Sequence, residues 1–300
     1  MTHGLLPLPQ PDTQPLQHVL RVLQLTRTGE TRFTGYSLPE VGNRIYGGQV
    51  MSQALIAAAE TVDAEKVGMR LPHSMHGYFL RPGRTDEPLE FSVEILHDGR
   101  SFSTRRTHAL QGGVPILSMI YSFQLEQPGV DHEVPAPEAP DPIDLPSAAD
   151  LFAEVDHPAA RRLMRLGAFE LRHVEPDIYF TPDPERRHTQ RLWMRTRTPL
   201  PDRTPQVLHR ALLAYACDQV MLEPILRAHG LSWTSGLAVA SLDHAMWWHR
   251  PLDVSRCLLY VQESPSAEGG RGLGFARIYS GDGRLVATAA QQGMVRVPRD

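Results

Sequence analysis

The sequence has only two cysteines among its 300 residues, Cys217 and Cys257. Two cysteines are too few for a disulfide framework, and their spacing does not match a metal-binding motif. A hydrophobic core must therefore hold the fold, and a reducing compartment fits this composition. Cys217 directly precedes Asp218 but has no evident histidine partner in the sequence, so we interpret it as a buried structural thiol and not as a nucleophile.

Long apolar runs and an excess of one charge are also missing. No apolar run approaches the roughly 18 residues of a membrane-spanning helix, so we expect no membrane span. The 30 Lys and Arg against 34 Asp and Glu give a net charge of −4, without the basic stripe of a nucleic-acid-binding protein. The N-terminal residues lack the basic start and apolar stretch of a signal peptide. Together these absences predict a cytoplasmic protein that binds no nucleic acid.

Several common catalytic motifs are absent. The sequence contains no GxSxG nucleophile elbow, no GxGxxG or Walker A loop and no HExxH zinc motif. The pairs His73 with His76 and His244 with His249 have no cluster of Cys, Asp or Glu to complete a metal site. We therefore interpret these histidines as core or surface residues and expect no bound metal.

Hydrophobic periodicity predicts helices followed by antiparallel strands in the first half of the chain. Apolar residues at helical spacing over 16–25 predict a short amphipathic helix. The Ala-rich, proline-free run after Gly48 predicts a second helix that packs closely on a sheet. Strand-like runs follow at 73–80, 89–96, 101–110 and 114–125, with the hairpin motifs Asp98-Gly99 and Gly112-Gly113 between them.

Prolines and acidic residues dominate residues 128–148, which indicates a linker because proline resists both helix and central strand. We therefore divide the chain into an N-terminal domain over 1–127, this linker, and a C-terminal domain over 149–300. Helices are predicted over 149–165 and over 207–228, the second disturbed by Pro224. Strand-like runs follow at 237–248, 256–263, 273–280 and 284–296.

The order of a helix and then antiparallel strands thus occurs twice. Arg81 corresponds to Arg250 with a shift of 169 residues (250 minus 81), and Gly99 corresponds to Gly269 with a shift of 170 (269 minus 99). One inserted residue reconciles the two shifts. The repeat predicts an α+β fold of two units, each with one helix wrapped by a curved antiparallel sheet.

Asp218 is the most informative single residue. In a helix, its neighbours one turn away would include Ala214, Tyr215, Met221 and Leu222, so the carboxylate would lie among mostly apolar groups. An unpaired buried carboxylate is costly, so this residue requires hydrogen bonds, a cation or a chemical role. A structural carboxylate is the alternative interpretation.

Ser241 and Gln291 each lie within a strand-like run, where polar residues usually face solvent. The repeat places Gln49 opposite Asp218 and Pro72 opposite Ser241 in the first half. Since Gln49 is not a base and Pro72 has no hydroxyl, the first half cannot duplicate chemistry performed by this set. We therefore expect one active site per chain.

These residues lie in segments that resemble the acyl-CoA thioesterase II family, over about residues 16–297. The matching segments are Tyr46–Leu55, His76–Gly83 and Asp98–Phe102 in the first half, and Tyr215–Asp218, Asp243–Pro251 and Gln291–Gly293 in the second. So many matches in the same order make the resemblance specific.

The resemblance implies a double hotdog fold, in which two fused helix-wrapped antiparallel sheets form a pseudo-dimer. It implies hydrolysis of fatty acyl-CoA to fatty acid and CoA, without metal or organic cofactor, and we expect medium- to long-chain substrates. The family's catalytic Asp and Gln map onto Asp218 and Gln291, and its Thr or Ser maps onto Ser241. The C-terminal domain would then carry the catalytic residues.

A thioester carbonyl is electrophilic enough for direct attack by an oriented water. Asp218 would accept the proton of that water as general base, and Ser241 and Gln291 would hold the water and the carboxylate by hydrogen bonds. The oxyanion of the tetrahedral intermediate needs donors, and the backbone N–H groups near Gly48 and Gln49, at a helix start, are the predicted ones. A covalent acyl-enzyme through Ser241 is the disfavoured alternative.

Two other functions stay open at this point. A hotdog hydratase or dehydratase acting on enoyl thioesters needs an acid–base pair, commonly Asp with His, but the first histidine after Asp218 is His229. A non-catalytic acyl-CoA-binding protein would not need Asp218, Ser241 and Gln291 together. Because hotdog sheets often pair again, we also expect a homodimer or a homotetramer.

Overall fold

The chain folds into two compact units. The computed structural model describes residues 15–63, 65, 68–153, 155 and 167–297. Backbone contacts group Met1–Asp131 with Pro201–Ala216 as unit 1, and His132–Leu200 with Cys217–Asp300 as unit 2. The predicted division at 1–127, 128–148 and 149–300 did not include the grouping of residues 201–216 with the first unit, and its boundaries stay a prediction.

Unit 1 consists of an antiparallel sheet and helices. Its helical elements are α1 (Pro15–Leu23), η1 (Val41–Asn43), α2 (Gly47–Ala59) and α6 (Gln206–Cys217), of which only Cys217 is counted in unit 2. Its strands are β1 (Thr26–Gly29), β2 (Arg32–Gly35), β3 (Arg70–Phe79), β4 (Leu89–Asp98), β5 (Phe102–Gln111) and β6 (Val114–Leu125). The two helices and the four long strands predicted for the first half are therefore confirmed.

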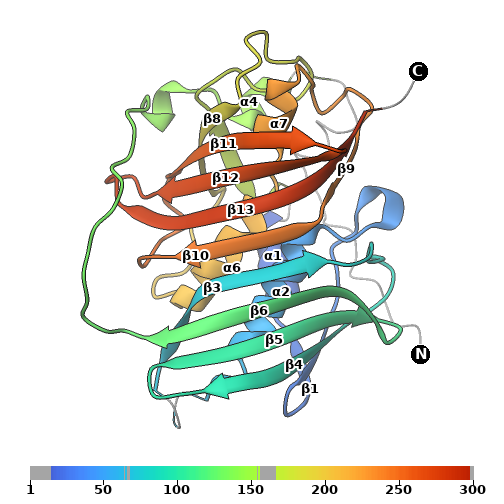
Figure 1. Ribbon diagram of the computed structural model, residues 1–300, viewed down its shortest axis with the longest axis vertical. Coiled ribbons are helices and arrows are strands. Elements are labelled where there is room, and N and C mark those ends of the chain that lie inside the picture. The colour runs from blue at the N-terminus through green and yellow to red at the C-terminus, as the bar shows by residue number, and fades with distance from the viewer. Residues whose placement is uncertain (1–14, 64, 66–67, 154, 156–166, 298–300) are drawn as a thin grey trace. The chain divides into compact units, whose positions relative to one another are not determined.

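The strands of unit 1 pair in the order β1-β2-β4-β5-β6-β3, and every pair is antiparallel (Figure 1). Gly112 and Gly113, with φ of 54° and 77°, form the turn between β5 and β6, because glycine adopts this left-handed backbone without steric cost. Buried and more exposed residues alternate along β5, so one face of the sheet packs on α2. The small side chains of α2 permit this close approach.

Unit 2 also consists of an antiparallel sheet and helices. Its helical elements are η2 (Pro142–Asp144), α4 (Ala148–Phe152) and α7 (Glu223–Ala228). Its strands are β7 (Phe169–His173), β8 (Thr189–Thr196), β9 (Ala238–Ser241), β10 (Asp243–Trp248), β11 (Leu258–Glu268), β12 (Arg271–Tyr279) and β13 (Leu285–Arg296). Strands β7 and β8 had not been predicted.

The strands of unit 2 pair in the order β7-β8-β11-β12-β13-β10, with β9 also paired to β13 (Figure 1). This order matches that of unit 1 strand for strand. Gly99 follows β4 and Gly269 follows β11 in the equivalent hairpins. The predicted internal repeat and the α+β double hotdog fold are therefore confirmed.

Two predicted helices differ from the structure. The prediction over 149–165 corresponds to α4 at its start, and its residues 154 and 156–165 lie outside the described residues. The single helix predicted over 207–228 is wrong, because α6 ends at Cys217 and α7 begins only at Glu223. Pro224 lies in the first turn of α7, where its missing N–H has no helical partner to lose. Asp218 is therefore the first residue of the turn between two helices.

The proline-rich segment 128–148 is anchored to unit 2 from Glu133 onward. The carboxylate of Glu133 lies 3.1 Å from Arg250 Nη1 and accepts the Leu285 N–H at 2.9 Å. Trp193 Nε1 donates to the Pro140 carbonyl at 3.0 Å. The prolines thus keep the segment out of regular structure, while neighbouring polar groups hold it against unit 2.

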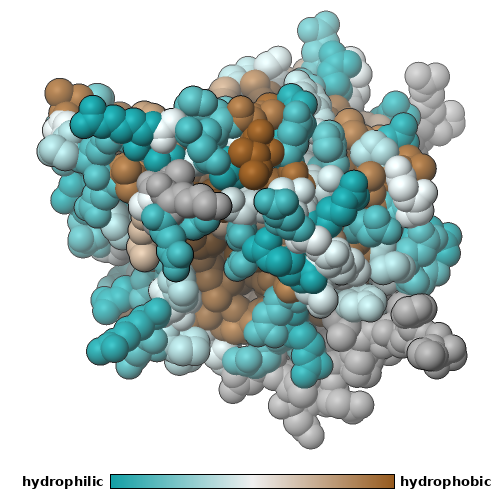
Figure 2. Space-filling model, turned by 90° about the horizontal axis from the view of Figure 1, so that it is seen from below, coloured by the Kyte–Doolittle hydropathy of each residue, from teal (hydrophilic) through white to brown (hydrophobic). Residues whose placement is uncertain are grey.

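Charged and polar side chains cover most of the face seen from below, with hydrophobic side chains gathered in a hollow between them (Figure 2). In the part of the chain that the structure describes, no helix has the length and apolar character needed to cross a membrane.

Glycines in β12 and β13 let the segment after Asp218 lie directly on the sheet. A Cβ at Gly274 would overlap the backbone carbonyl oxygen of Met221, and one at Gly293 would overlap the side chain of Leu222. Gly274 is the register partner of Gln291. These two positions therefore set how closely the turn that begins at Asp218 approaches Gln291.

We predict that Gly274→Ala destabilises the protein by about 1–3 kcal/mol, because a backbone carbonyl cannot rotate away as a side chain would. Gly281→Ala is the matched control, since its Cβ would lie 3.6 Å from the nearest atom, the Cys257 carbonyl oxygen. Urea unfolding of both variants measures the difference. Equal free energies of unfolding for the two variants would contradict the close approach.

Candidate functional site

The structure brings Asp218, Ser241 and Gln291 together within unit 2. Ser241 Oγ donates to Asp218 Oδ1 at 2.8 Å. Gln291 Nε2 donates to the same carboxylate oxygen at 2.9 Å and to Ser241 Oγ at 2.9 Å. The three side chains therefore form a closed hydrogen-bonded triangle, in which one carboxylate oxygen accepts two bonds.

These residues come from three different elements. Asp218 follows the last residue of α6, Ser241 ends β9, and Gln291 lies within β13. Gln291 is fully buried, whereas Asp218 and Ser241 are half-buried. The carboxylate and the hydroxyl thus lie nearer to solvent than the amide that holds them.

Strands β9 and β10 both pair with β13, and their registers on that strand differ by one residue. Ser241 pairs with Gly293 of β13, whereas Ala245 pairs with Ala290. Three residues, 242–244, therefore oppose two, 291–292, which is the pattern of a β-bulge. The extra residue reverses the alternation of side chains, so Ser241 and His244 face the same side of the sheet although they lie three positions apart in the sequence.

The bulge leaves backbone groups without a partner in the ladder, and the Asp243 side chain binds one of these groups. Its Oδ1 accepts the Gln292 N–H at 2.9 Å, while the Leu242 N–H donates to the Gln292 carbonyl at 2.9 Å. Buried backbone donors are nearly always paired in this way. The continuous strand predicted over 237–248 is therefore wrong at Leu242, and the break is what places the site.

His244, which the sequence predicts to be a core or surface histidine, lies in the core beside Gln291. Its Nδ1 lies 2.5 Å from Gln291 Oε1, and the ring is 1% exposed. Burial lowers the pKa of His244, and the nearby carboxylate of Asp218 opposes this only in part. The ring is therefore neutral at physiological pH. The sequence carried no sign of this contact, because it depends on the bulge at Leu242.

A buried ion-pair network fixes α7, which follows the turn that begins at Asp218. Arg227 is fully buried, with Nη1 at 3.1 Å from Asp183 Oδ2 and Nε donating to Gln190 Oε1 at 2.6 Å. Glu223 Oε2 accepts from Gln190 Nε2 at 2.8 Å and lies 3.1 Å from His173 Nε2. The network ties α7 to β7, β8 and the loop between them.

Asp183 is the acidic partner whose removal tests this network. Burial raises its pKa, but the Glu185 N–H and the guanidinium groups of Arg187 and Arg227 outweigh that effect and lower it below its ordinary value. We predict that Asp183→Asn costs about 3–5 kcal/mol at neutral pH, because it leaves the buried Arg227 charge without its carboxylate.

The pH dependence of that cost has a defined sign. Because the folded pKa of Asp183 is lowered, its contribution is fully present above the unfolded value, about 3.9, and is lost as pH falls through the folded value. Unfolding at pH 7 and pH 3 should show the wild-type advantage shrinking. Glu185→Gln, whose carboxylate is 67% exposed, should cost about 0–1 kcal/mol; an equal cost for both variants would contradict the prediction.

Gly48 and Gln49, the predicted oxyanion donors, lie at the start of α2 in unit 1. A Cβ at Gly48 would overlap the Tyr215 carbonyl oxygen, which also accepts a hydrogen bond from Tyr46 at 2.6 Å. The Gln49 N–H donates to the Tyr46 carbonyl at 3.1 Å. The oxyanion role stays a prediction, and this bond argues against the Gln49 N–H as a donor, while close packing alone explains the glycine.

The remaining predicted groups have simple environments. Cys217 is fully buried, and burial raises the pKa of its thiol, which disfavours the thiolate form. His73 Nε2 lies 2.8 Å from Ser122 Oγ. Among the described residues, no group of three or more His, Cys, Asp or Glu is placed to hold a metal ion.

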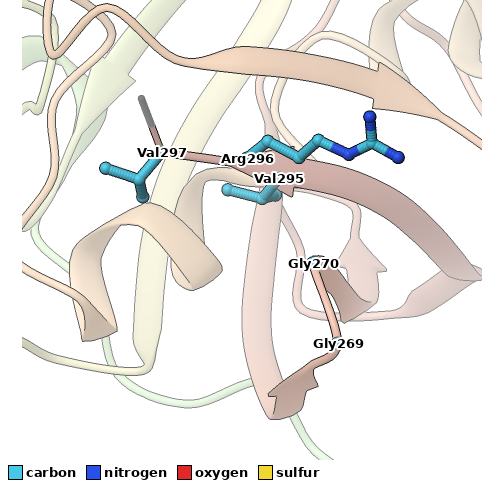
Figure 3. A pocket seen from close by; sticks show the side chains of 5 residues that line it. All are labelled: Gly269, Gly270, Val295, Arg296 and Val297. Atoms are coloured by element: carbon cyan, nitrogen blue, oxygen red, sulfur yellow. The ribbon is translucent and has the colours of Figure 1, made fainter. Parts of the chain in front are cut away.

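A cavity of about 530 Å³ lies at the end of β13. The residues that line it are Gly269, Gly270, Val295, Arg296 and Val297 (Figure 3). None of the side chains of the hydrogen-bonded triangle is among them.

Comparison with known families gives two consecutive matches. The family described as "Acyl-CoA thioesterase N-terminal domain" matches residues 37–124, and the "Acyl-CoA thioesterase C-terminal domain" matches residues 137–295. Among curated relatives, "Acyl-CoA thioesterase 2" of Haemophilus influenzae is 32% identical and covers 94% of this chain and 98% of its own. Human "Acyl-coenzyme A thioesterase 8" is 33% identical over 93% of this chain and 89% of its own.

Solved structures give the same picture. The acyl-CoA thioesterase II TesB2 from Mycobacterium marinum is 39% identical, with a TM-score of 0.77, and covers 93% of this chain and 98% of its own. A protein described with a hot dog fold from Alicyclobacillus acidocaldarius has a TM-score of 0.75 at 19% identity, over 94% of this chain and 99% of its own. The second likeness concerns the fold alone.

Proposed function

Because the chain belongs to the acyl-CoA thioesterase II family, we propose that it hydrolyses acyl-CoA thioesters with a water activated by Asp218 and held by Ser241 and Gln291. The observation that supports this assignment is the closed hydrogen-bonded triangle of these side chains in unit 2. The family accounts for the reaction, and the triangle accounts for how this chain would perform it.

The proposed reaction needs one water and one base. The Asp218 carboxylate removes a proton from water as its oxygen bonds to the thioester carbonyl carbon. The tetrahedral intermediate then collapses, the carbon–sulfur bond breaks, and the sulfur leaves as CoA thiol with the proton returned by Asp218. The products are a free carboxylic acid and CoA, so all atoms of acyl-CoA and water are accounted for.

Ser241 and Gln291 contribute by position. Both donate to Asp218 Oδ1, which fixes the carboxylate plane. A fixed base reduces the entropy lost when the water is aligned for attack.

We propose medium- to long-chain fatty acyl-CoA as the substrates, and a homodimer or homotetramer as the assembly.

The first test is release of free CoA thiol from acyl-CoAs of increasing chain length. Asp218→Asn should lower kcat by about 10²-fold or more, because the amide cannot accept the proton. Asp282→Asn, at the exposed turn between β12 and β13, is the matched control and should keep wild-type activity. Absence of thiol release by the wild type from every thioester would favour the non-catalytic binding function instead.

Ser241 distinguishes the water mechanism from a covalent one. Its hydroxyl donates directly to Asp218, so this carboxylate is a base within reach of either nucleophile. With water as nucleophile, Ser241→Ala should lose about 10-fold to 10²-fold in kcat through loosened positioning, and Ser241→Thr should keep most activity. A trapped acyl-serine seen by mass spectrometry would overturn the water mechanism.

The hydratase alternative gains one observation from the structure, since His244 lies beside the site. Its Nδ1 faces Gln291 Oε1, however, and Gln291 stands between it and Asp218. Crotonyl-CoA separates the two functions: a hydratase removes the enone absorbance without releasing thiol, whereas a thioesterase releases thiol.

A further inference from the structure

We propose that His244 is a positioning residue that fixes which way the Gln291 amide faces. The inference rests on the proposed role of Gln291 in holding Asp218 and Ser241. A primary amide has a donor end and an acceptor end of nearly equal shape. Only one of its two orientations is useful at this site.

The useful orientation directs Nε2 toward two acceptors. Gln291 Nε2 lies 2.9 Å from Asp218 Oδ1 and 2.9 Å from Ser241 Oγ. A 180° rotation would place Oε1 against the carboxylate, where two acceptors repel each other. It would also remove one of the two hydrogen bonds that Ser241 and Gln291 donate to Asp218 Oδ1.

His244 supplies the group that distinguishes the two orientations. In the orientation present, Gln291 Oε1 lies 2.5 Å from Nδ1 of the ring. Two lone pairs at that distance would repel, so Nδ1 carries the hydrogen and donates. The rotated amide would instead bring its NH₂ group against this N–H. Asp218 and His244 therefore select the same orientation from opposite sides of the amide.

The burial of Gln291 and His244 raises the free-energy cost of the wrong amide orientation. Gln291 is 0% exposed and His244 is 1% exposed, so water cannot replace a missing partner. An unpaired buried polar group costs about 1–3 kcal/mol. His244 Nε2 is buried and has no hydrogen-bond partner among the described residues, which suits the unprotonated nitrogen of this tautomer. Burial lowers the pKa of the ring, so the neutral form persists.

Three substitutions test the donor. His244→Asn keeps an N–H near the position of Nδ1, His244→Gln moves the amide outward toward the position of Nε2, and His244→Leu removes the donor. With an acyl-CoA substrate, we expect His244→Leu and His244→Gln to lower kcat by about 10- to 100-fold, since a displaced positioning group costs this much. His244→Asn should lie within about threefold of wild type, and KM should change by less than about threefold in all three.

A mutant cycle with Gln291→Ala separates positioning from general stability. If His244 acts through Gln291, His244→Leu should lower kcat by less than about twofold further in the Gln291→Ala background. Equal losses in both backgrounds would overturn the proposal. If His244→Leu does not fold, the Asn and Gln variants decide it, and equal kcat values for those two would overturn it as well.

A readout without catalysis keeps this inference separate from the proposed function. The side-chain NH₂ signals of Gln291, assigned by their loss in Gln291→Glu, should shift and exchange faster with solvent in His244→Leu than in wild type. His244→Asn should restore them. Unchanged amide signals in His244→Leu would overturn the positioning role even in an active enzyme, whereas the expected shift in a protein without thioesterase activity would contradict only the proposed function.

Discussion

A one-residue shift in the ladder along β13 is the constraint on which the site depends. Ser241 pairs with Gly293 and Ala245 pairs with Ala290, so the strand opposite β13 gains a residue at the bulge. Regular pairing would direct Ser241 and His244 to opposite faces of the sheet. The bulge directs both toward Gln291. The amide of one buried residue can then meet a hydroxyl, a carboxylate and an imidazole at once.

The Asp218 carboxylate reaches the Gln291 amide because glycines lie where the turn after Asp218 crosses the sheet. Gly274 and Gly293 leave room for the backbone at Met221 and the side chain of Leu222. On the far side of that turn, Arg227 and Glu223 tie α7 to the interior of unit 2. Asp218 is thus positioned by close backbone packing and by buried polar contacts, and Ser241 and Gln291 then hold its carboxylate.

The sequence predicted the features that local patterns determine. Alternation and hairpin glycines located the long strands, and the spacing of Gly99 and Gly269 indicated the repeat that the strand order confirms. The break after Cys217 was missed, because an apolar run such as 207–228 has helical periodicity throughout. The contact of His244 with Gln291 was missed for a different reason. A single inserted residue in a strand changes which side chains meet, and single-sequence periodicity does not register it.

The two units also differ in what they do with equivalent positions. With the 169- and 170-residue shifts of the repeat, Gln49 corresponds to Asp218 and Tyr121 corresponds to Gln291. Gln49 Oε1 accepts the Leu38 N–H at 3.0 Å, and the Tyr121 hydroxyl donates to the Met51 carbonyl at 3.1 Å. These groups satisfy the buried backbone of unit 1, and neither is a carboxylate that could accept a proton from water. Unit 1 therefore has the same fold but uses these positions to bind its own backbone groups. This difference supports one active site per chain.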